Sequence, residues 1–520
     1  MNILGIGGVL GDAAAVLIKD GHIAAAIEES KLARRAPQPG RLPDASIAAC
    51  LRLGGITAED VDCVALARPL PTGGALPLAL QMFHNARIVS IDHHAAHAAS
   101  AFFASPFNEA TVITLDREGD LRCGAKWRGA GNHLTLEDEI LYPDSIGQLY
   151  GRVTELLGFA SRADEHRLQW LSVEGEPRWA EIFEEITGGH SFDRSYFDFG
   201  RKDNGGFSAK FFERLGLTSS AELGTSERAD LAASVQRALE VYVMRLAAGA
   251  KNVCLAGGVA WNALMVSALE HAGRYEGVFA QPVAGNAGTA LGAALQVWHD
   301  AAGHDATARI DAGGYCLGPA FTAQEFKQVL ENCKLRFQLL PTVPETIGAA
   351  VRQLKDNHIV AWMQGRMEFG PRALGNRSIL ASPHDPYSAE NLNTFIKHRE
   401  ASRKFAASVP AELAAEYFEA GPNARHLATV SRVKPAYQAQ FRGALLANNL
   451  VRVHTVAKED NPLYWQLLHA FGDATGLPVL YNTSFNLFGE PMVCTPRDAI
   501  RSFYSSGIDA MVAGNFLLEK

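Results

Sequence analysis

The chain has few cysteines and no long hydrophobic run. Its 520 residues include seven scattered cysteines with no C-x-x-C pair, a pattern typical of a reducing compartment. No stretch reaches the roughly 18 consecutive apolar residues of a membrane-spanning helix. The first residues also lack the basic and apolar segments of a signal peptide. We therefore expect a cytoplasmic protein without membrane association.

Positive charge is also scarce. The formal net charge is -8, which gives no general attraction to nucleic acid. A hydrophobic content of 48%, with 48 glycines and no low-complexity segment, is typical of a large α/β enzyme. A chain of this length exceeds what one core supports, so at least two domains are expected. Any anion site must depend on particular side chains.

A unit of three short strands followed by helix occurs twice. The pattern predicts strands at Ile3–Gly7, Ala13–Ile18 and His22–Glu28, then helix around Pro43–Leu53. It recurs as strands at Ala110–Asp116, Cys123–Trp127 and Leu134–Ile140, then helix from Ser145. This weak repeat predicts an internally duplicated, actin-like core.

Three further helices and a domain boundary follow. Apolar spacing predicts a helix over Asp230–Ala248, with Asp230 as its N-cap. A strand at Val253–Ala256 leads into a helix over Asn262–Glu270, and another helix is expected over Thr289–Val297. The proline-containing segment Leu340–Pro344 divides residues 1–340 from the more basic residues 341–520.

A pair of histidines is the first candidate site. His93 and His97 lie four residues apart in a predicted helix, so both rings share one face and can bind a divalent metal. An ordinary surface or core pair explains them equally well, and His94 points elsewhere.

Glycine loops at strand ends suggest a nucleotide site. Gly257-Gly258 and Gly285 to Gly288 would let backbone amides approach a phosphate. Asp116 ends an apolar strand, from which its carboxylate can meet a metal. Taken alone, each loop is better explained as a tight turn, and Asp116 with the charged residues after it as a hairpin turn.

The second half carries a more specific pattern. Arg372 and Arg377 lie among glycines, and Lys397, Arg399, Arg403 and Arg452 follow. Arginine forks hold phosphate oxygens in a bidentate manner. With the polar loop Asn482–Asn486 at a strand end, these residues favour an anion pocket over scattered salt bridges.

These segments together resemble the O-carbamoyltransferase family, which includes tobramycin, cephem and nodulation-factor carbamoyltransferases. The marks are His93-x-x-x-His97-Ala98-Ala99-Ser100, Gly370-Pro371-Arg372-Ala373-Leu374-Gly375-x-Arg377-Ser378 and Asn482-Thr483-Ser484-Phe485-Asn486. The resemblance covers essentially the whole chain. It implies an α/β protein with an actin-like (ASKHA), duplicated N-terminal domain and a C-terminal domain like threonylcarbamoyl-adenylate synthases.

The resemblance also implies the chemistry. Carbamoyl phosphate and ATP would give carbamoyl-adenylate in the C-terminal domain, and the N-terminal domain would pass the carbamoyl group to a hydroxyl of a small-molecule, natural-product acceptor such as an antibiotic precursor. The residues implied for the carbamoyl-phosphate pocket are Arg372, Arg377, Lys397, Arg403, Arg452, Asn482 and Ser484, of which Arg372, Lys397, Arg403, Arg452 and Asn482 would also act in catalysis. Nucleotide would contact Asp116, Gly257, Gly258, Asn262 and Gly288, and a divalent metal would bind His93, His97 and Asn286. That metal is iron by family analogy, or Mg²⁺ accompanying ATP.

Three stretches depart from the family pattern. Gly11-Asp12-Ala13 lacks a histidine that the family carries after its first strand. Asn286 replaces an aspartate ligand and is a weaker oxygen donor. Arg167 to Ser172 replaces the usual Lys-x-Met-Gly-Leu-Ala. Carbamoylation of an amine, or a nucleotide-binding protein without catalysis, therefore stay open as alternatives.

Overall fold

Two five-stranded sheets of the same topology form the first half of the chain. The computed structural model describes residues 1–35, 39–70, 80–189, 191–200, 204–301, 310, 312–400 and 403–520. The strand order is β3-β2-β1-β4-β5 in one sheet and β8-β7-β6-β9-β10 in the other. In both sheets the first three strands are antiparallel and the last two add in parallel. The strands are β1 (Asn2–Gly7), β2 (Ala14–Lys19), β3 (His22–Glu28), β4 (Cys63–Ala67), β5 (Arg87–Ile91), β6 (Glu109–Gly119), β7 (Arg122–Ala130), β8 (His133–Leu141), β9 (Asn252–Ala256) and β10 (Gly277–Ala280). This matched topology confirms the predicted actin-like duplication.

A single mixed sheet of ten strands organises the second half. Its order is β11-β20-β19-β12-β13-β18-β14-β17-β16-β15. The strands are β11 (Gln338–Leu339), β12 (Val360–Met363), β13 (Arg377–Ala381), β14 (Ala406–Pro410), β15 (Phe418–Glu419), β16 (Ser431–Val433), β17 (Leu450–Val456), β18 (Leu480–Ser484), β19 (Ala510–Ala513) and β20 (Phe516–Glu519). The edge strand β11, just before the expected boundary at residue 340, pairs with β20 near the end of the chain.

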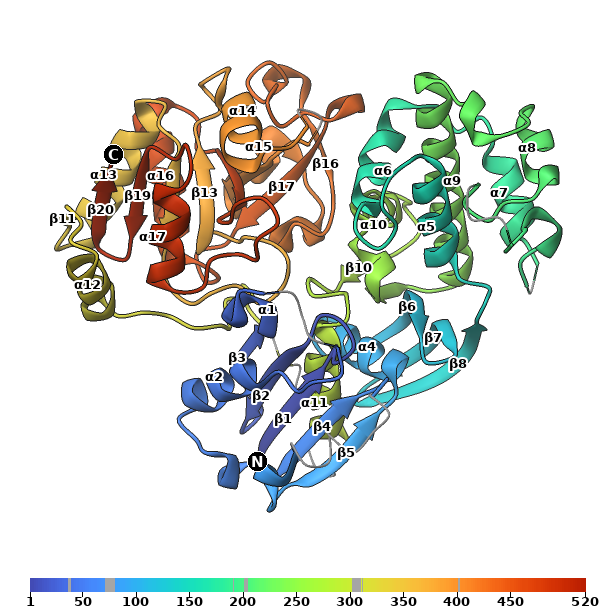
Figure 1. The fold of residues 1–520 in the computed structure, drawn as a ribbon, viewed down its shortest axis with the longest axis horizontal. Helices are drawn as coiled ribbons and strands as arrows, with labels where there is room; N and C mark the ends of the chain where they lie inside the picture. The colour runs from blue at the N-terminus through green and yellow to red at the C-terminus, as the bar shows by residue number, and fades with distance from the viewer. Residues whose placement is uncertain are drawn as a thin grey trace.

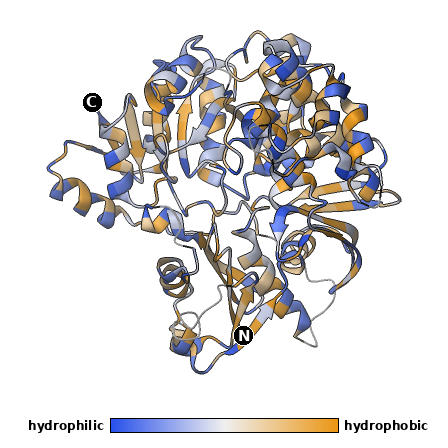
Figure 2. Cartoon of the chain, turned by 45° about the vertical axis from the view of Figure 1, so that its right-hand side comes forward, coloured by the Kyte–Doolittle hydropathy of each residue, from blue (hydrophilic) through white to orange (hydrophobic). Residues whose placement is uncertain are grey.

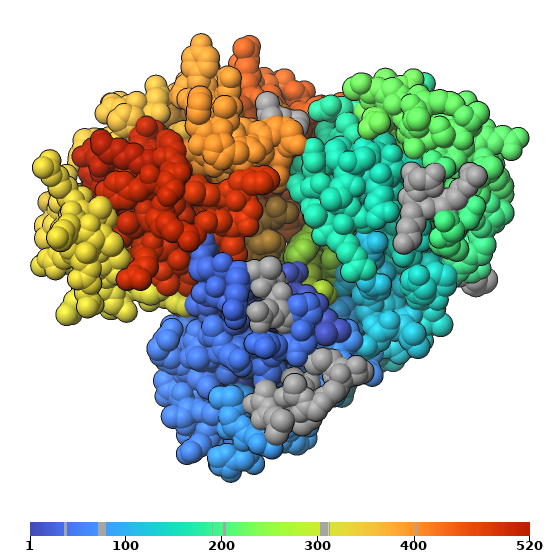
Figure 3. Space-filling view, viewed as in Figure 1, coloured from blue at the N-terminus to red at the C-terminus, as the bar shows by residue number. Residues whose placement is uncertain are grey.

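The helices cover these sheets in three groups (Figure 1). With the first sheet lie α1 (Glu29–Ala33), α2 (Asp44–Gly54), α4 (His93–Phe102) and α11 (Gly288–Asp300). A helical mass above the second sheet contains α5 (Ile146–Leu156), α6 (Glu165–Leu171), α7 (Ala180–Thr187), α8 (Ala209–Leu215), α9 (Thr225–Leu246) and α10 (Ala263–Glu270). The C-terminal sheet carries α12 (Ala323–Asn332), α13 (Val343–Lys355), α14 (Ser388–Asn391), α15 (Ala414–Tyr417), α16 (Pro462–Thr475) and α17 (Pro496–Tyr504). Apolar residues lie in the strands and on the helices that pack against them (Figure 2), and the three groups of elements meet around a recess (Figure 3).

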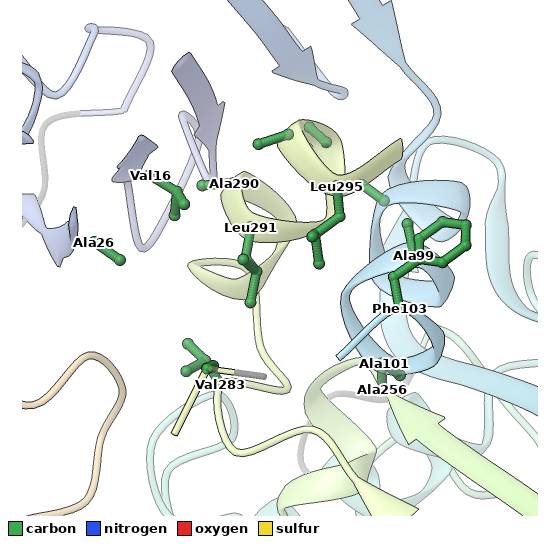
Figure 4. Close-up of a cluster of buried hydrophobic side chains, with 14 of the residues drawn as sticks. Val16, Ala26, Ala99, Ala101, Phe103, Ala256, Val283, Ala290, Leu291 and Leu295 are labelled. Atoms are coloured by element: carbon green, nitrogen blue, oxygen red, sulfur yellow. The ribbon is translucent and has the colours of Figure 1, made fainter. Parts of the chain in front are cut away.

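Small residues bring α4 and α11 into close contact at the centre of the N-terminal half. Ala290, Leu291 and Leu295 of α11 pack between the first sheet and α4 (Figure 4). A Cβ atom on Gly292 would lie 1.7 Å from the carbonyl oxygen of Ala96, so only glycine fits there. This contact fixes the helix that carries His93.

One predicted helix boundary is wrong. Helix α9 begins at Thr225, five residues before the expected N-cap Asp230. Asp230 is buried inside the helix, where it forms an ion pair with Arg178 and accepts from the backbone N–H of Glu176. Its carboxylate serves a tertiary contact, which local sequence preference does not reveal. Across the described ranges, none of the helices combines the length and apolarity needed to cross a membrane.

Candidate functional site

Two histidines of α4 converge on one carboxylate. Asp92 caps the helix, since its Oδ1 accepts from the backbone N–H groups of His94 and Ala95. The Nε2 atoms of His93 and His97 then lie 3.1 and 2.9 Å from the same Oδ2 atom of Asp116, at the end of β6. All three side chains are largely buried, and their candidate ligand atoms lie within 4.8 Å of one another.

The hydrogen bonds around this triad leave ligand atoms pointing inward. His93 Nδ1 lies 3.1 Å from the carbonyl oxygen of Arg68, which can only accept, so Nδ1 carries the proton. In the neutral ring, the lone pair of Nε2 therefore faces the Asp116 carboxylate. Two acceptors at this distance need a cation between them, either a proton or a metal. Two imidazoles and a carboxylate form a suitable donor set for a divalent metal, and the backbone carbonyl of Arg68 fixes the ring of His93 through its Nδ1 atom.

The charges inside the triad support each other. Burial alone would raise the pKa of Asp116, but hydrogen bonds and attraction from His93 and His97 hold it well below its usual value. Burial opposes a charge on His93, yet contact with Asp116 raises its pKa. His94 turns away as expected: its Nδ1 lies 2.9 Å from Thr114 Oγ1, and burial lowers its pKa to about 3.

Asn286 lies near the triad on the wall of a cavity. This cavity of about 370 Å³ is bounded by the Gly8–Gly11 turn, His93, Asn286 and a rim of paired charges that includes Arg68, Asp120, Arg162 and Glu118. At Gly11, a Cβ atom would lie 3.4 Å from Asn286 Nδ2. Gly11 and Asn286, two positions at which the sequence departs from the family pattern, are thus neighbours on the cavity wall. The metal-type cluster itself contains Asp116, which we assigned to the nucleotide set from the sequence.

The expected nucleotide residues fall into two groups. The backbone N–H of Gly258 donates to Asp116 Oδ1 at 3.0 Å, and Gly257 adopts a φ of +87° against the end of β6. Asn262 instead caps α10 and donates to Gln236 in a buried network. A Cβ atom on Gly288 would lie 1.8 Å from the carbonyl oxygen of Val283. Local packing therefore accounts for Asn262 and Gly288, whereas Gly257 and Gly258 adjoin the triad.

Four arginines gather at one end of the C-terminal sheet. Burial lowers the pKa of Arg452 well below its usual range, and repulsion from Arg372, Arg399 and Arg403 adds to this effect. Within the described ranges, none of the four forms an ion pair with a carboxylate; the adjacent Glu400 pairs instead with Arg167. Confined cations without a countercharge form a strong anion site. We call these four residues the cationic cluster.

Lys397 lies beside the cationic cluster, but its ammonium group donates hydrogen bonds to oxygen atoms of the chain itself. Its Nζ donates to the carbonyl oxygens of Ser484 and Asn486 and to Asn486 Oδ1, at 2.6, 2.9 and 2.7 Å. Ser484 Oγ also donates to Asn486 Oδ1. Burial, with repulsion from Arg399 and Arg403, lowers the pKa of Lys397 well below its usual value. Lys397 thus organises the loop that follows Asn482.

Arg377 does not join the cationic cluster. Its side chain is fully buried, and its Nη atoms donate to the carbonyl oxygens of Gln364, Gly365, Asn376 and Pro319. The guanidinium therefore holds the Gly365–Ser378 loop together. Its spacing from Arg372 gave no sign of this difference.

Helix α6 adds residues that sequence reasoning did not assign to the site. The Trp170 ring lies 5.7 Å from the Arg452 guanidinium carbon, and Arg167 reaches Glu400. His166 is flanked by Arg403 and Arg372: burial and their repulsion lower its pKa to about 4. These residues lie in or next to Arg167 to Ser172, the stretch that departs from the family pattern. That departure was the sequence feature that could have pointed to them. The N-terminal half thus forms one wall of the cationic cluster.

Comparison with known proteins also separates an N-terminal from a C-terminal part of the chain. A duplicated actin-like half with a His-His-Asp cluster is joined to a sheet that carries the cationic cluster. Family models described as carbamoyltransferase N-terminus and carbamoyltransferase C-terminus match residues 75–295 and 351–520. The chain belongs to the carbamoyltransferase family and is a transferase.

Three relatives illustrate the range of the family. An uncharacterized protein of Synechocystis sp. is 34% identical over 100% of this chain and 97% of its own length. The nodulation protein NolNO of Sinorhizobium fredii is 32% identical over 98% of this chain and 79% of that protein. The 3'-hydroxymethylcephem-O-carbamoyltransferase of Streptomyces clavuligerus is 30% identical over 50% of this chain and 47% of that enzyme.

Proposed function

We propose that the chain is an ATP-dependent carbamoyltransferase that takes its carbamoyl group from carbamoyl phosphate through carbamoyl-adenylate. The cationic cluster carries this proposal, because four arginines without carboxylate partners suit a small dianionic donor beside ATP. Carbamate, released when water takes the phosphoryl group of the donor, would attack the α-phosphorus of ATP and expel pyrophosphate. Arg372, Arg403 and Arg452 would neutralise the charge that accumulates on the phosphoryl oxygens.

Transfer to the acceptor would take place in the N-terminal half. The acceptor hydroxyl would attack the carbamoyl carbon and release AMP, giving a carbamate ester. The cavity beside His93, Gly11 and Asn286 is large enough for part of a small-molecule acceptor. His93, His97 and Asp116 would hold a divalent metal, which would supply positive charge against the adenylate phosphate. The likeness to a cephem O-carbamoyltransferase supports a hydroxyl acceptor.

The test is pyrophosphate release from ATP and carbamoyl phosphate by the purified protein. Arg452→Gln with Arg372→Gln should reduce release at least about 100-fold, because two charge-assisted contacts are lost. Arg432→Gln is the matched control, because Arg432 is exposed on the neighbouring strand β16. If the wild type releases no pyrophosphate with any common divalent metal present, the proposal is wrong. Mass spectrometry of the product separates hydroxyl from amine carbamoylation, and nucleotide binding without turnover would favour the non-catalytic alternative.

A further inference from the structure

A buried chain of hydrogen bonds crosses three neighbouring strands at Asn482. Ser408 lies on β14, His454 on β17 and Asn482 on β18, and these strands are adjacent in the C-terminal sheet. Ser408 is in register with His454, and Ala406 with both Asn482 and Arg452. Register partners, and residues two apart on a strand, share a face of the sheet. Asn482, Ser408, His454 and Arg452 therefore lie on one face.

The chemistry of the partners fixes how the Asn482 carboxamide is turned. Asn482 Nδ2 lies 3.1 Å from the carbonyl oxygen of Ala373 and 3.2 Å from Ser408 Oγ. Because a carbonyl oxygen only accepts, the amide nitrogen must face Ala373. Ser408 Oγ accepts from this amide and can give its own proton to His454 Nδ1, 3.1 Å away. His454 must then be neutral, and burial does lower its pKa, to about 3.

This arrangement leaves one acceptor atom unused. Asn482 Oδ1 is buried, and it has no hydrogen-bond partner in the described part of the chain. The neighbouring Arg452 and Arg372 only donate, so they suit the oxygens of a carbamoyl phosphate. The amino group of that donor is its one N–H source and needs an acceptor.

We propose that Ser408 and His454 are positioning residues that hold the Asn482 carboxamide with its oxygen toward the amino group of the carbamoyl donor. This proposal rests on the proposed function and adds donor selectivity to it. An acyl phosphate with a methyl group in place of the amino group would leave Asn482 Oδ1 unpaired, and such sites discriminate strongly. Without Ser408, only the carbonyl oxygen of Ala373 holds the carboxamide in this orientation, so its oxygen is less firmly directed toward the donor.

The experiment compares the affinities of carbamoyl phosphate and acetyl phosphate by calorimetry on the full chain. The wild type should prefer carbamoyl phosphate. Ser408→Ala and His454→Leu should each reduce that preference about tenfold, chiefly through weaker binding of carbamoyl phosphate. His454→Asn should retain it, because the asparagine oxygen can accept from Ser408 near the position of Nδ1. Ser502→Ala controls for loss of a buried serine hydroxyl, since Ser502 Oγ has no partner within the described residues.

Several outcomes would overturn the proposal. If Ser408→Ala retains the preference, or weakens both donors equally, Ser408 has only a structural role. Thermal melting checks that each variant folds, and where Ser408→Ala does not fold, equal preferences in His454→Leu and His454→Asn are decisive against positioning. A wild type that binds no carbamoyl phosphate overturns the proposed function and this proposal with it. A wild type that binds it, with unchanged preference in the variants, overturns the positioning role alone.

Discussion

Arg372 lies in the loop before β13 and Arg377 begins that strand, yet the two side chains occupy different environments. Arg377 is fully buried against carbonyl oxygens, whereas Arg372 belongs to the cationic cluster. We expect Arg377→Lys to lower the free energy of unfolding by about 3 kcal/mol, because an ammonium cannot reach the same set of carbonyls. Arg372→Lys should weaken carbamoyl-phosphate binding about tenfold through loss of the bidentate fork, with little change in unfolding. Urea unfolding and calorimetry measure the two effects.

The reverse result would be informative. Should Arg377→Lys weaken donor binding while leaving unfolding unchanged, Arg377 would act in the pocket after all. Arg432→Lys, on the exposed face of β16, serves both measurements as the control.

His454 should make folding sensitive to mild acid. Its pKa is about 3 in the folded chain because of burial and repulsion from His426, with Asp460 opposing the shift, against 6.5 when unfolded. Above pH 6.5 the ring is neutral in both states, and below it only the unfolded chain takes up the proton. This group should therefore remove about 2 kcal/mol of stability by pH 5. Urea unfolding at pH 7.5 and pH 5 should show a smaller decrease for His454→Leu; equal decreases would contradict the assignment.

The sequence indicates which residue types form the triad and the cationic cluster, but it does not indicate which role each residue has. Spacing alone placed His93 and His97 together, because four residues make one helical turn. Asp116 could not be recognised as the third member of the triad from the sequence, because only the folded second sheet brings this part of β6 against α4. We expected Arg377 to line the pocket with Arg372, whereas the structure buries its guanidinium against backbone carbonyl oxygens, because local spacing does not say which side chain the sheet buries. His454 and Ser408 gave no signal, because cross-strand register is a tertiary property.

Elements with strong local signals agree with the predictions. The two β units were expected from alternating residues and glycine turns, and their matched strand orders bear this out. The predicted start of α9 was wrong, because Asp230 forms a buried ion pair inside the helix and does not cap it. The edge pairing of β11 with β20 joins residues too far apart for any window of sequence to detect.

Helix α1 fastens the N-terminal half to the Arg372 loop. Lys31 Nζ donates to the carbonyl oxygens of Glu368 and Gly370 and lies 2.9 Å from Glu28, which accepts from the Gly370 N–H. Lys31→Met should reduce the free energy of unfolding by about 3 kcal/mol, because it leaves Glu28 buried without a countercharge.

Adding Glu28→Gln to Lys31→Met separates charge from shape. The double variant should regain part of the lost stability in urea unfolding, since no uncompensated charge remains. Lys327→Met, at an exposed lysine of α12, is the control. Equal unfolding of Lys31→Met and the wild type would show that this contact does not stabilise the loop.

The molecule places its two proposed chemical centres on different sheets, and α6 of the N-terminal half reaches the second of them. The triad lies between α4 and β6, while the cationic cluster lies on the C-terminal sheet and is walled by α6. Carbamoyl activation and carbamoyl transfer should therefore be separable by mutation. His93→Ala should keep pyrophosphate release within about twofold of the wild type, because no contact of His93 reaches the C-terminal sheet in the described ranges.

The same variant should lose transfer to the acceptor at least about 100-fold, as expected when the positive charge that would stabilise the departing phosphate of AMP is removed. Metal content after dialysis gives a readout independent of activity, and it should fall in His93→Ala while remaining unchanged in Arg452→Gln. Arg452→Gln should instead lose pyrophosphate release and transfer together, because transfer depends on the activated donor. If His93→Ala abolished pyrophosphate release, activation would need the N-terminal triad, and the two centres would have to work as one.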